Sequence, residues 1–202
     1  MSQPSITVHK FGGAALADLT AFRRAAEIVA AHGGARPVIV VSAMRGVTDA
    51  LGTAATSAAP RARATLAALE SRHRTVANGL TSDPQQRAEV SANIASIFAD
   101  LTKVCTRRSR GALDAAELDL VMSRGEVLAA MLVVAALAQR GLPAIAIDAT
   151  KLVYTDGVAG SAAPDVAKTT AAAARAAVAG ASRGASSRSC PASSVAAGRV
   201  PS

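Results

Sequence analysis

The sequence predicts an α/β fold with a mainly parallel sheet, on three observations. Short β-rich runs at 5–11, 37–42 and 144–149 are separated by longer segments of helical periodicity. Two of these runs, "PVIVVSAM" and "PAIAIDA", are almost continuously apolar, as in parallel strands that are covered on both faces. Glycine pairs follow the first run and the first helical segment, where a strand–helix–strand unit needs turns.

Each element can be placed in order. A helix at 19–32 follows the first strand, with Asp18 as its predicted cap and an apolar face on or beside Leu19, Phe22, Ala26, Ile28 and Val29. A second helix follows "VVSAM", and 60–112 predicts an inserted helical hairpin that breaks at "TSDPQQ". Residues 113–141 indicate two helices, or one helix bent at Gly125. A loop at 154–165 and an alanine-rich helix at 166–180 come after the third strand.

Composition excludes several classes of protein. The net charge is +8, but the basic residues are scattered and the aromatic residues few, which argues against a nucleic-acid partner. Cys105 and Cys190 form neither a disulfide framework nor metal-ligand spacing, and we predict no metal site. The N-terminus lacks the pattern of a signal peptide, and the apolar run 126–141 is shorter than the ~20 residues that a bilayer needs. We therefore expect a cytoplasmic protein with no membrane partner.

The stretch "HKFGGAALAD" has the form of a phosphate-binding turn. Gly12 and Gly13 would let backbone amides approach phosphate oxygens at a helix start, and Lys10 would add a positive charge. The alternative is a tight turn whose lysine points to solvent.

The stretch "VVSAMRGVTDAL" places Ser42 and Thr48 just beyond the end of a strand. Ligands bind at the carboxyl ends of strands in open α/β sheets, so both hydroxyls are candidates for substrate contacts. Taken alone, the plainer interpretation is favoured: Ser42 ends the strand and Thr48 caps the next helix.

The stretch "LDLVMSRGEVLAA" places Glu126 before an apolar segment. A carboxylate is stabilised at a helix N-terminus, and taken alone this stretch favours that capping role. The same carboxylate could bind an ammonium group.

Together, "KFGGAALAD", "VVSAMRGVTDAL", "SRGEVLAA", "AIAIDA" and "YTDG" resemble in order and spacing the motifs of the aspartokinase branch of the amino acid kinase family. The resemblance spans roughly residues 5–160, and implies a three-layer α/β/α sandwich whose N-terminal part is 1–180. It implies that Lys10, Phe11, Gly12, Gly13 and Ser42 meet the ATP phosphates, with Lys10 stabilising charge on the transferred group. It also implies that Thr48 and Glu126 bind L-aspartate.

The reaction implied is phosphoryl transfer from Mg-ATP to the β-carboxylate of aspartate, the first step of lysine, threonine and methionine synthesis. Such enzymes need positioning and charge neutralisation rather than a covalent nucleophile. The family forms homo-oligomers.

The sequence departs from the family pattern in ways that predict impaired activity. Ala14 and Ala15 stand where the family has Thr-Ser, and Ala129 replaces a serine. The later "GRGGSD" loop and the ACT regulatory domains are absent, so we expect an incomplete sandwich and doubtful oligomerisation. The alternative function is a non-catalytic remnant, or a module that binds a nucleotide or a partner.

Residues 181–202 are rich in serine and arginine and predict an aberrant tail without regular structure. If its serines are TCN codons, the shifted frame of 186–195 permits "VVPVVPGFIG", the family's next strand and turn. We interpret the tail as the product of a frameshift between Asp156 and Ser186, near Gly180. The alternative is a native tail.

Overall fold

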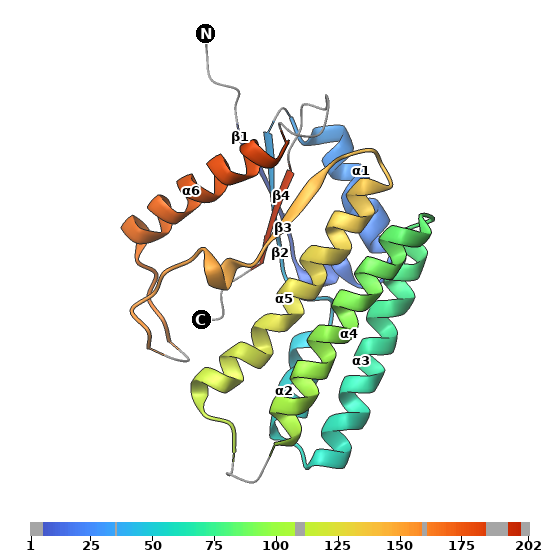
Figure 1. Cartoon of the computed structure of the whole chain (residues 1–202), viewed down its shortest axis with the longest axis vertical. Coiled ribbons are helices and arrows are strands. Elements are labelled where there is room, and N and C mark those ends of the chain that lie inside the picture. Colours follow the sequence, from blue (N-terminus) through green and yellow to red (C-terminus); the bar gives the residue numbers. More distant parts are fainter. Residues whose placement is uncertain (1–5, 35, 108–111, 159–160, 185–193, 199–202) are drawn as a thin grey trace.

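The computed structural model describes residues 6–34, 36–107, 112–158, 161–184 and 194–198 and has a parallel sheet at its centre (Figure 1). The strands are β1 (Ile6–Phe11), β2 (Arg36–Val41), β3 (Ala144–Ile147) and β4 (Ser194–Gly198), in the order β1-β2-β4-β3. All neighbouring pairs are parallel, and Lys10 lies beside Val40 in the register. The predicted α/β class and its three parallel strands are confirmed.

Strand β4 and the end of helix α6 (Val166–Gly184) correct the expectation of no regular structure for 181–184 and 194–198, and the rest of the predicted tail, 185–193 and 199–202, lies outside the described residues. Helix α6 runs beyond residue 181, and Ser194–Gly198 lie between β2 and β3. The place of the strand that we expected to be missing is therefore occupied. A backbone ladder accounts for this, since main-chain amides and carbonyls pair whatever the side chains are.

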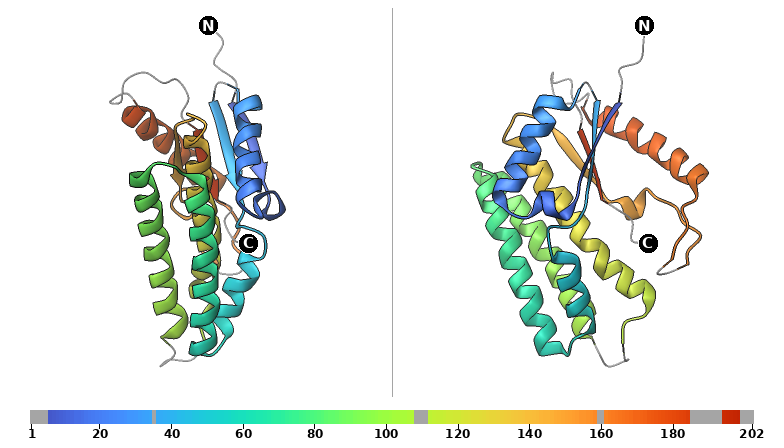
Figure 2. Two further views of the ribbon diagram at one scale, coloured as in Figure 1. Left: turned by 90° about the vertical axis from the view of Figure 1, so that its right-hand side faces the viewer. Right: turned by 180° about the vertical axis from the view of Figure 1, so that it is seen from behind.

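One face of the sheet is covered by a thick helical layer. Helices α1 (Leu19–His32) and α5 (Ala115–Ala138) lie on this side, and α2 (Val47–Thr56), α3 (Ala59–Leu80) and α4 (Pro84–Thr106) extend the layer beyond the strand ends (Figure 2). Phe22, Phe98 and Leu132 are among the buried side chains of this core. The predicted hairpin is present as α3 and α4.

The other face is only partly covered, so the sandwich is incomplete. Helix α6 lies on this side of the sheet (Figure 2). The side chains of β1 alternate, with Phe11 buried and Ile6 and Val8 61% and 63% exposed. These two side chains would be covered in a complete sandwich.

Local signals explain most helix ends. Asp18 caps α1 as predicted and accepts a hydrogen bond from the Ala21 amide at 2.9 Å. Ile28, which we expected on or beside the apolar face of this helix, is exposed.

Residues 115–138 form one helix, α5, and not a pair. At 24 residues, α5 is long and apolar enough to cross a bilayer, contrary to the expected shortness, but most of its apolar stretch is buried within the fold.

Candidate functional site

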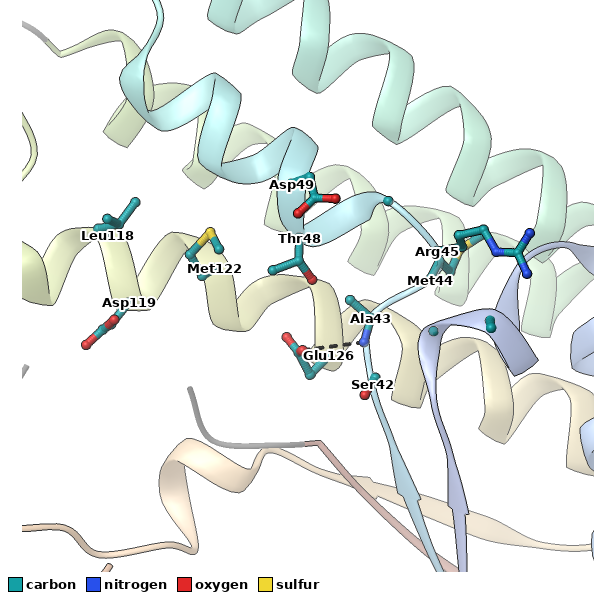
Figure 3. Close-up of a pocket in the computed structure, with 13 residues that line it drawn as sticks. Ser42, Ala43, Met44, Arg45, Thr48, Asp49, Leu118, Asp119, Met122 and Glu126 are labelled. Carbon is teal, nitrogen blue, oxygen red and sulfur yellow. Dashed lines mark hydrogen bonds between the residues drawn. The ribbon is translucent and has the colours of Figure 1, made fainter. Parts of the chain in front are cut away.

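A cleft of about 600 Å³ opens at the carboxyl ends of β1 and β2 (Figure 3). Its walls are the turn after β1, the loop from β2 to α2, and one face of α5. The described residues that line it are Gly13, Ala14, Ser42, Ala43, Met44, Arg45, Gly46, Thr48, Asp49, Leu118, Asp119, Met122 and Glu126. Four predicted site residues, Gly13, Ser42, Thr48 and Glu126, thus meet in one cavity.

The turn after β1 lies against the loop after β2. The Ser42 amide donates to the Phe11 carbonyl at 3.0 Å, which continues the strand pairing past Val41. A Cβ at Gly13 would lie 2.9 Å from the Ala43 carbonyl oxygen, closer than real Cβ contacts. Gly13 is therefore required by space, and it brings the two walls together.

The loop after β2 ends at Gly46, which caps α2 with a left-handed φ of 75°. Glycine adopts this conformation without the penalty that a Cβ brings. Thr48 is already inside α2, so the interpretation of Thr48 as the helix cap is wrong. Its side chain instead lines the cleft, near Glu126 (Figure 3).

Glu126 lies in the middle of α5, so its predicted capping role at a helix N-terminus is wrong. The Asp114 side chain caps this helix by accepting a hydrogen bond from the Glu117 amide at 2.8 Å, and the Glu117 side chain accepts one from the Asp114 amide. The Glu126 Oε1 atom accepts instead from the Ala43 amide at 3.4 Å (Figure 3). This hydrogen bond joins the middle of α5 to the loop after β2, with the Thr48 side chain nearby (Figure 3).

Three other predicted residues lie outside the set that lines the cleft. Lys10 is exposed at the end of β1, and Phe11 is buried in the core with only 7% of its surface exposed. Gly12 precedes the short 3-10 turn η1 (Gly13–Leu16) with an ordinary extended backbone. The cleft therefore uses Gly13 and Ala14 from the glycine turn.

Charged residues that sequence reasoning missed also line the cleft. Asp49 and Asp119 join Glu126, and Arg45 is the basic residue among the described lining residues. Figure 3 shows Arg45 directed away from Glu126 and Thr48. Arg45 and Asp49 lie inside the motif "VVSAMRGVTDAL", and Asp119 precedes Glu126 by two helical turns, so motif and helical spacing could have identified them.

The comparisons with known proteins agree with this architecture. The model of the amino acid kinase family matches residues 5–181. This chain belongs to the amino acid kinase family. A search of curated proteins finds no significant match.

Two solved structures of Escherichia coli aspartokinase III share the fold. The complex with lysine and aspartate (T-state) superposes with a TM-score of 0.78 at 23% identity, covering 95% of this chain and 40% of that one. The complex with aspartate and ADP (R-state) gives a TM-score of 0.76 at 24% identity, with the same coverage. This amino acid kinase chain thus spans about two fifths of the length of those enzymes.

Proposed function

We propose that the chain is an aspartate kinase-like protein that binds MgATP and L-aspartate in the cleft and whose phosphoryl transfer is impaired. Family membership and the fold shared with aspartokinase III support a kinase-like function. The observation that carries the finer proposal is the meeting of Gly13, Ser42, Thr48 and Glu126 around one cavity. These residues come from three segments that the sequence motifs singled out independently.

We assign the two ends of the cleft to the two substrates. Backbone amides at Gly13 and Ala14, with the Ser42 hydroxyl, would receive phosphate oxygens, as glycine turns at helix starts do. Arg45 would add a positive charge on this side. The carboxylate of Glu126 would take the α-ammonium group of aspartate, and Thr48 would donate to a carboxylate.

In the proposed reaction, a carboxylate oxygen of aspartate attacks the γ-phosphorus of ATP, the bond to the β,γ-bridging oxygen breaks, and ADP leaves. Positioning and charge neutralisation supply most of the rate in such transfers. Lys10 is assigned to the charge on the transferred group, and its flexible four-carbon side chain would have to turn toward the cleft from the exposed end of β1. We expect a cytoplasmic protein with small-molecule partners.

The second candidate is a non-catalytic member that binds a nucleotide or a partner. It is favoured by Ala14 and Ala15, which offer no hydroxyl at the phosphate turn. The two candidates differ in whether aspartate binds and reacts.

Calorimetric titration with a non-hydrolysable MgATP analogue and with L-aspartate tests the proposal. We expect Glu126→Gln to weaken the binding of L-aspartate about tenfold or more, because a charged partner of the ammonium group is lost. Nucleotide binding should stay unchanged. Glu89→Gln, at an exposed position of α4, is the control. Nucleotide binding without aspartate binding would favour the second candidate. Trapping with hydroxylamine should detect no aspartyl phosphate from this chain alone, and abundant product would overturn the proposed impairment.

A further inference from the structure

Arg72 on helix α3 bridges the two segments that form one side of the cleft. Its Nη1 donates to the Arg45 carbonyl at 2.8 Å, and its Nη2 donates to the Ala17 carbonyl at 2.8 Å. Arg45 lies in the loop after β2, and Ala17 ends the 3-10 turn after β1. One side chain from a distant helix therefore holds both phosphate-side segments.

The guanidinium group suits this task because its donors have a fixed planar geometry. Two nitrogen atoms of one fork can donate in two directions at a set separation, whereas a lysine ammonium is a single point. The distance between Ala17 and Arg45 is thus set by the Arg72 fork.

The other contacts between these segments lie nearer the sheet. The Ser42 amide donates to the Phe11 carbonyl, and the Cβ position of Gly13 lies 2.9 Å from the Ala43 carbonyl oxygen and 3.6 Å from the Arg45 amide nitrogen. Ala17 and Arg45 are farther along each segment, where Arg72 makes the contact. The strand ends fix one end of this wall, and Arg72 fixes the other.

We propose that Arg72 is a positioning residue for the ligand cleft, and that helix α3 is thereby part of the functional site rather than only a packing element. The identity of the ligand rests on the proposed function. The bridging role itself does not, so it can be tested with or without a ligand.

The first measurement is amide hydrogen exchange of the ligand-free chain, comparing wild type with Arg72→Met. Loss of hydrogen bonds from a charged donor should raise exchange about tenfold or more in residues 12–17 and 43–48. Exchange in α4 should stay unchanged. Arg74→Met is the matched control, since Arg74 lies on the same helix and pairs with Glu70 at 2.9 Å on the surface.

The second measurement is the dissociation constant of the MgATP analogue. We expect Arg72→Met to weaken binding about tenfold, with Arg72→Lys intermediate because its ammonium cannot reproduce the fork. If Arg72 had a purely structural role, its variants would have a lower thermal midpoint, but their affinities for the MgATP analogue would not decrease in the order wild type, Arg72→Lys, Arg72→Met.

The outcomes separate the two proposals. If wild type binds no nucleotide, the proposed function fails, and the exchange experiment still decides the role of Arg72. The inference would be overturned if residues 12–17 and 43–48 of Arg72→Met exchanged at the wild-type rate. It would also be overturned if exchange in α3 and α4 rose as much as in these two segments. If Arg72→Met does not fold, Arg72→Lys decides it: faster exchange confined to the two segments supports the inference, and wild-type rates overturn it.

Discussion

Glu126 accepts a hydrogen bond from the Ala43 amide over 3.4 Å, and this contact joins the middle of α5 to the loop after β2. The preceding residue makes the approach possible: a Cβ at Gly125 would lie 2.8 Å from the Ala43 Cβ. Helix α5 and the loop are therefore at a separation that only glycine permits. Ala43 lies between two such glycines, with Gly13 against its carbonyl oxygen.

Replacing Gly125 with alanine should therefore displace the loop. We expect Gly125→Ala to lower the free energy of unfolding by about 1–3 kcal/mol, the usual cost of overpacking a core, and to weaken aspartate binding through Glu126. Gly52→Ala is the control, because among the described residues a Cβ there would meet the flexible Met122 side chain at 3.5 Å and nothing closer. That change should stabilise α2 by up to about 1 kcal/mol. Chemical denaturation measures the free energy of unfolding of both variants, and an equal change in Gly125→Ala and Gly52→Ala would contradict this account.

The two glycines of "KFGG" should differ in their tolerance of a side chain. Gly13→Ala places a Cβ against the Ala43 carbonyl, so we expect a loss of about 1–3 kcal/mol and weaker nucleotide binding. At Gly12, no described atom lies within 4 Å of the Cβ position, and the backbone is extended. Gly12→Ala should stay within about 0.5 kcal/mol of wild type. Thermal unfolding and nucleotide titration of both variants provide the check, and a more damaging Gly12→Ala would be inconsistent with this geometry.

The parts of the site that follow strands could be predicted from sequence. Gly13 and Ser42 come directly after short apolar runs, and parallel strands bring their carboxyl ends to one edge of a sheet. Thr48 follows in the first turn of α2. Position after the strands makes these residues candidates, and the resemblance to the family motifs assigns them to the site.

Other features depend on contacts between distant segments and could not be predicted in this way. The place of Glu126 within one long helix is an exception, since it follows from a local signal that sequence reasoning missed, the capping box of Asp114 and Glu117 at the helix start. The bridge from Arg72 joins residues 27 and 55 positions away. Strand β4 pairs with β2 and β3, both far from it in the sequence.

A buried histidine should make stability depend on pH. His73 is fully buried, its Nδ1 atom contacts the Leu69 carbonyl at 2.7 Å, and its Nε2 has no hydrogen-bond partner among the described residues. Burial lowers the pKa of this imidazole below its ordinary 6.5, nearby Arg72 lowers it further, and the Leu69 contact partly opposes the shift. Between the unfolded and the folded pKa of His73, the folded state therefore binds fewer protons than the unfolded state. The free energy of unfolding falls as the pH is lowered through this interval.

We expect the free energy of unfolding of wild type to fall more steeply than that of His73→Leu below about pH 6.5, by at most about 1.4 kcal/mol per pH unit, the slope for one proton. Urea denaturation across this range measures the difference. Parallel curves for wild type and His73→Leu would show that His73 does not contribute.

The DNA that encodes residues 181–202 should decide how this segment arose. The family match ends at residue 181, which supports the proposed change of reading frame near Gly180, whereas the pairing of β4 favours a native segment. We expect the alternate frame to encode a strand and a "GFIG" turn followed by "GRGGSD". Sequencing through the gene is sufficient, and the absence of these motifs from every frame would eliminate the frameshift.

Restoring hydroxyl groups at the phosphate turn should strengthen nucleotide binding. Ala14 and Ala15 are exposed in the turn after Gly13, and Ala14 lines the cleft, so larger side chains have room. Ala14→Thr with Ala15→Ser adds two donors at the position that the family pattern gives to Thr-Ser. Each new hydrogen bond contributes about 0.5–1.5 kcal/mol, so two bonds should make the MgATP analogue bind about five- to 150-fold more tightly. Ala88→Ser, at an exposed position of α4, is the control for a hydroxyl placed elsewhere. Calorimetry distinguishes them, and unchanged affinity in the double variant would mean that this turn does not receive the phosphates.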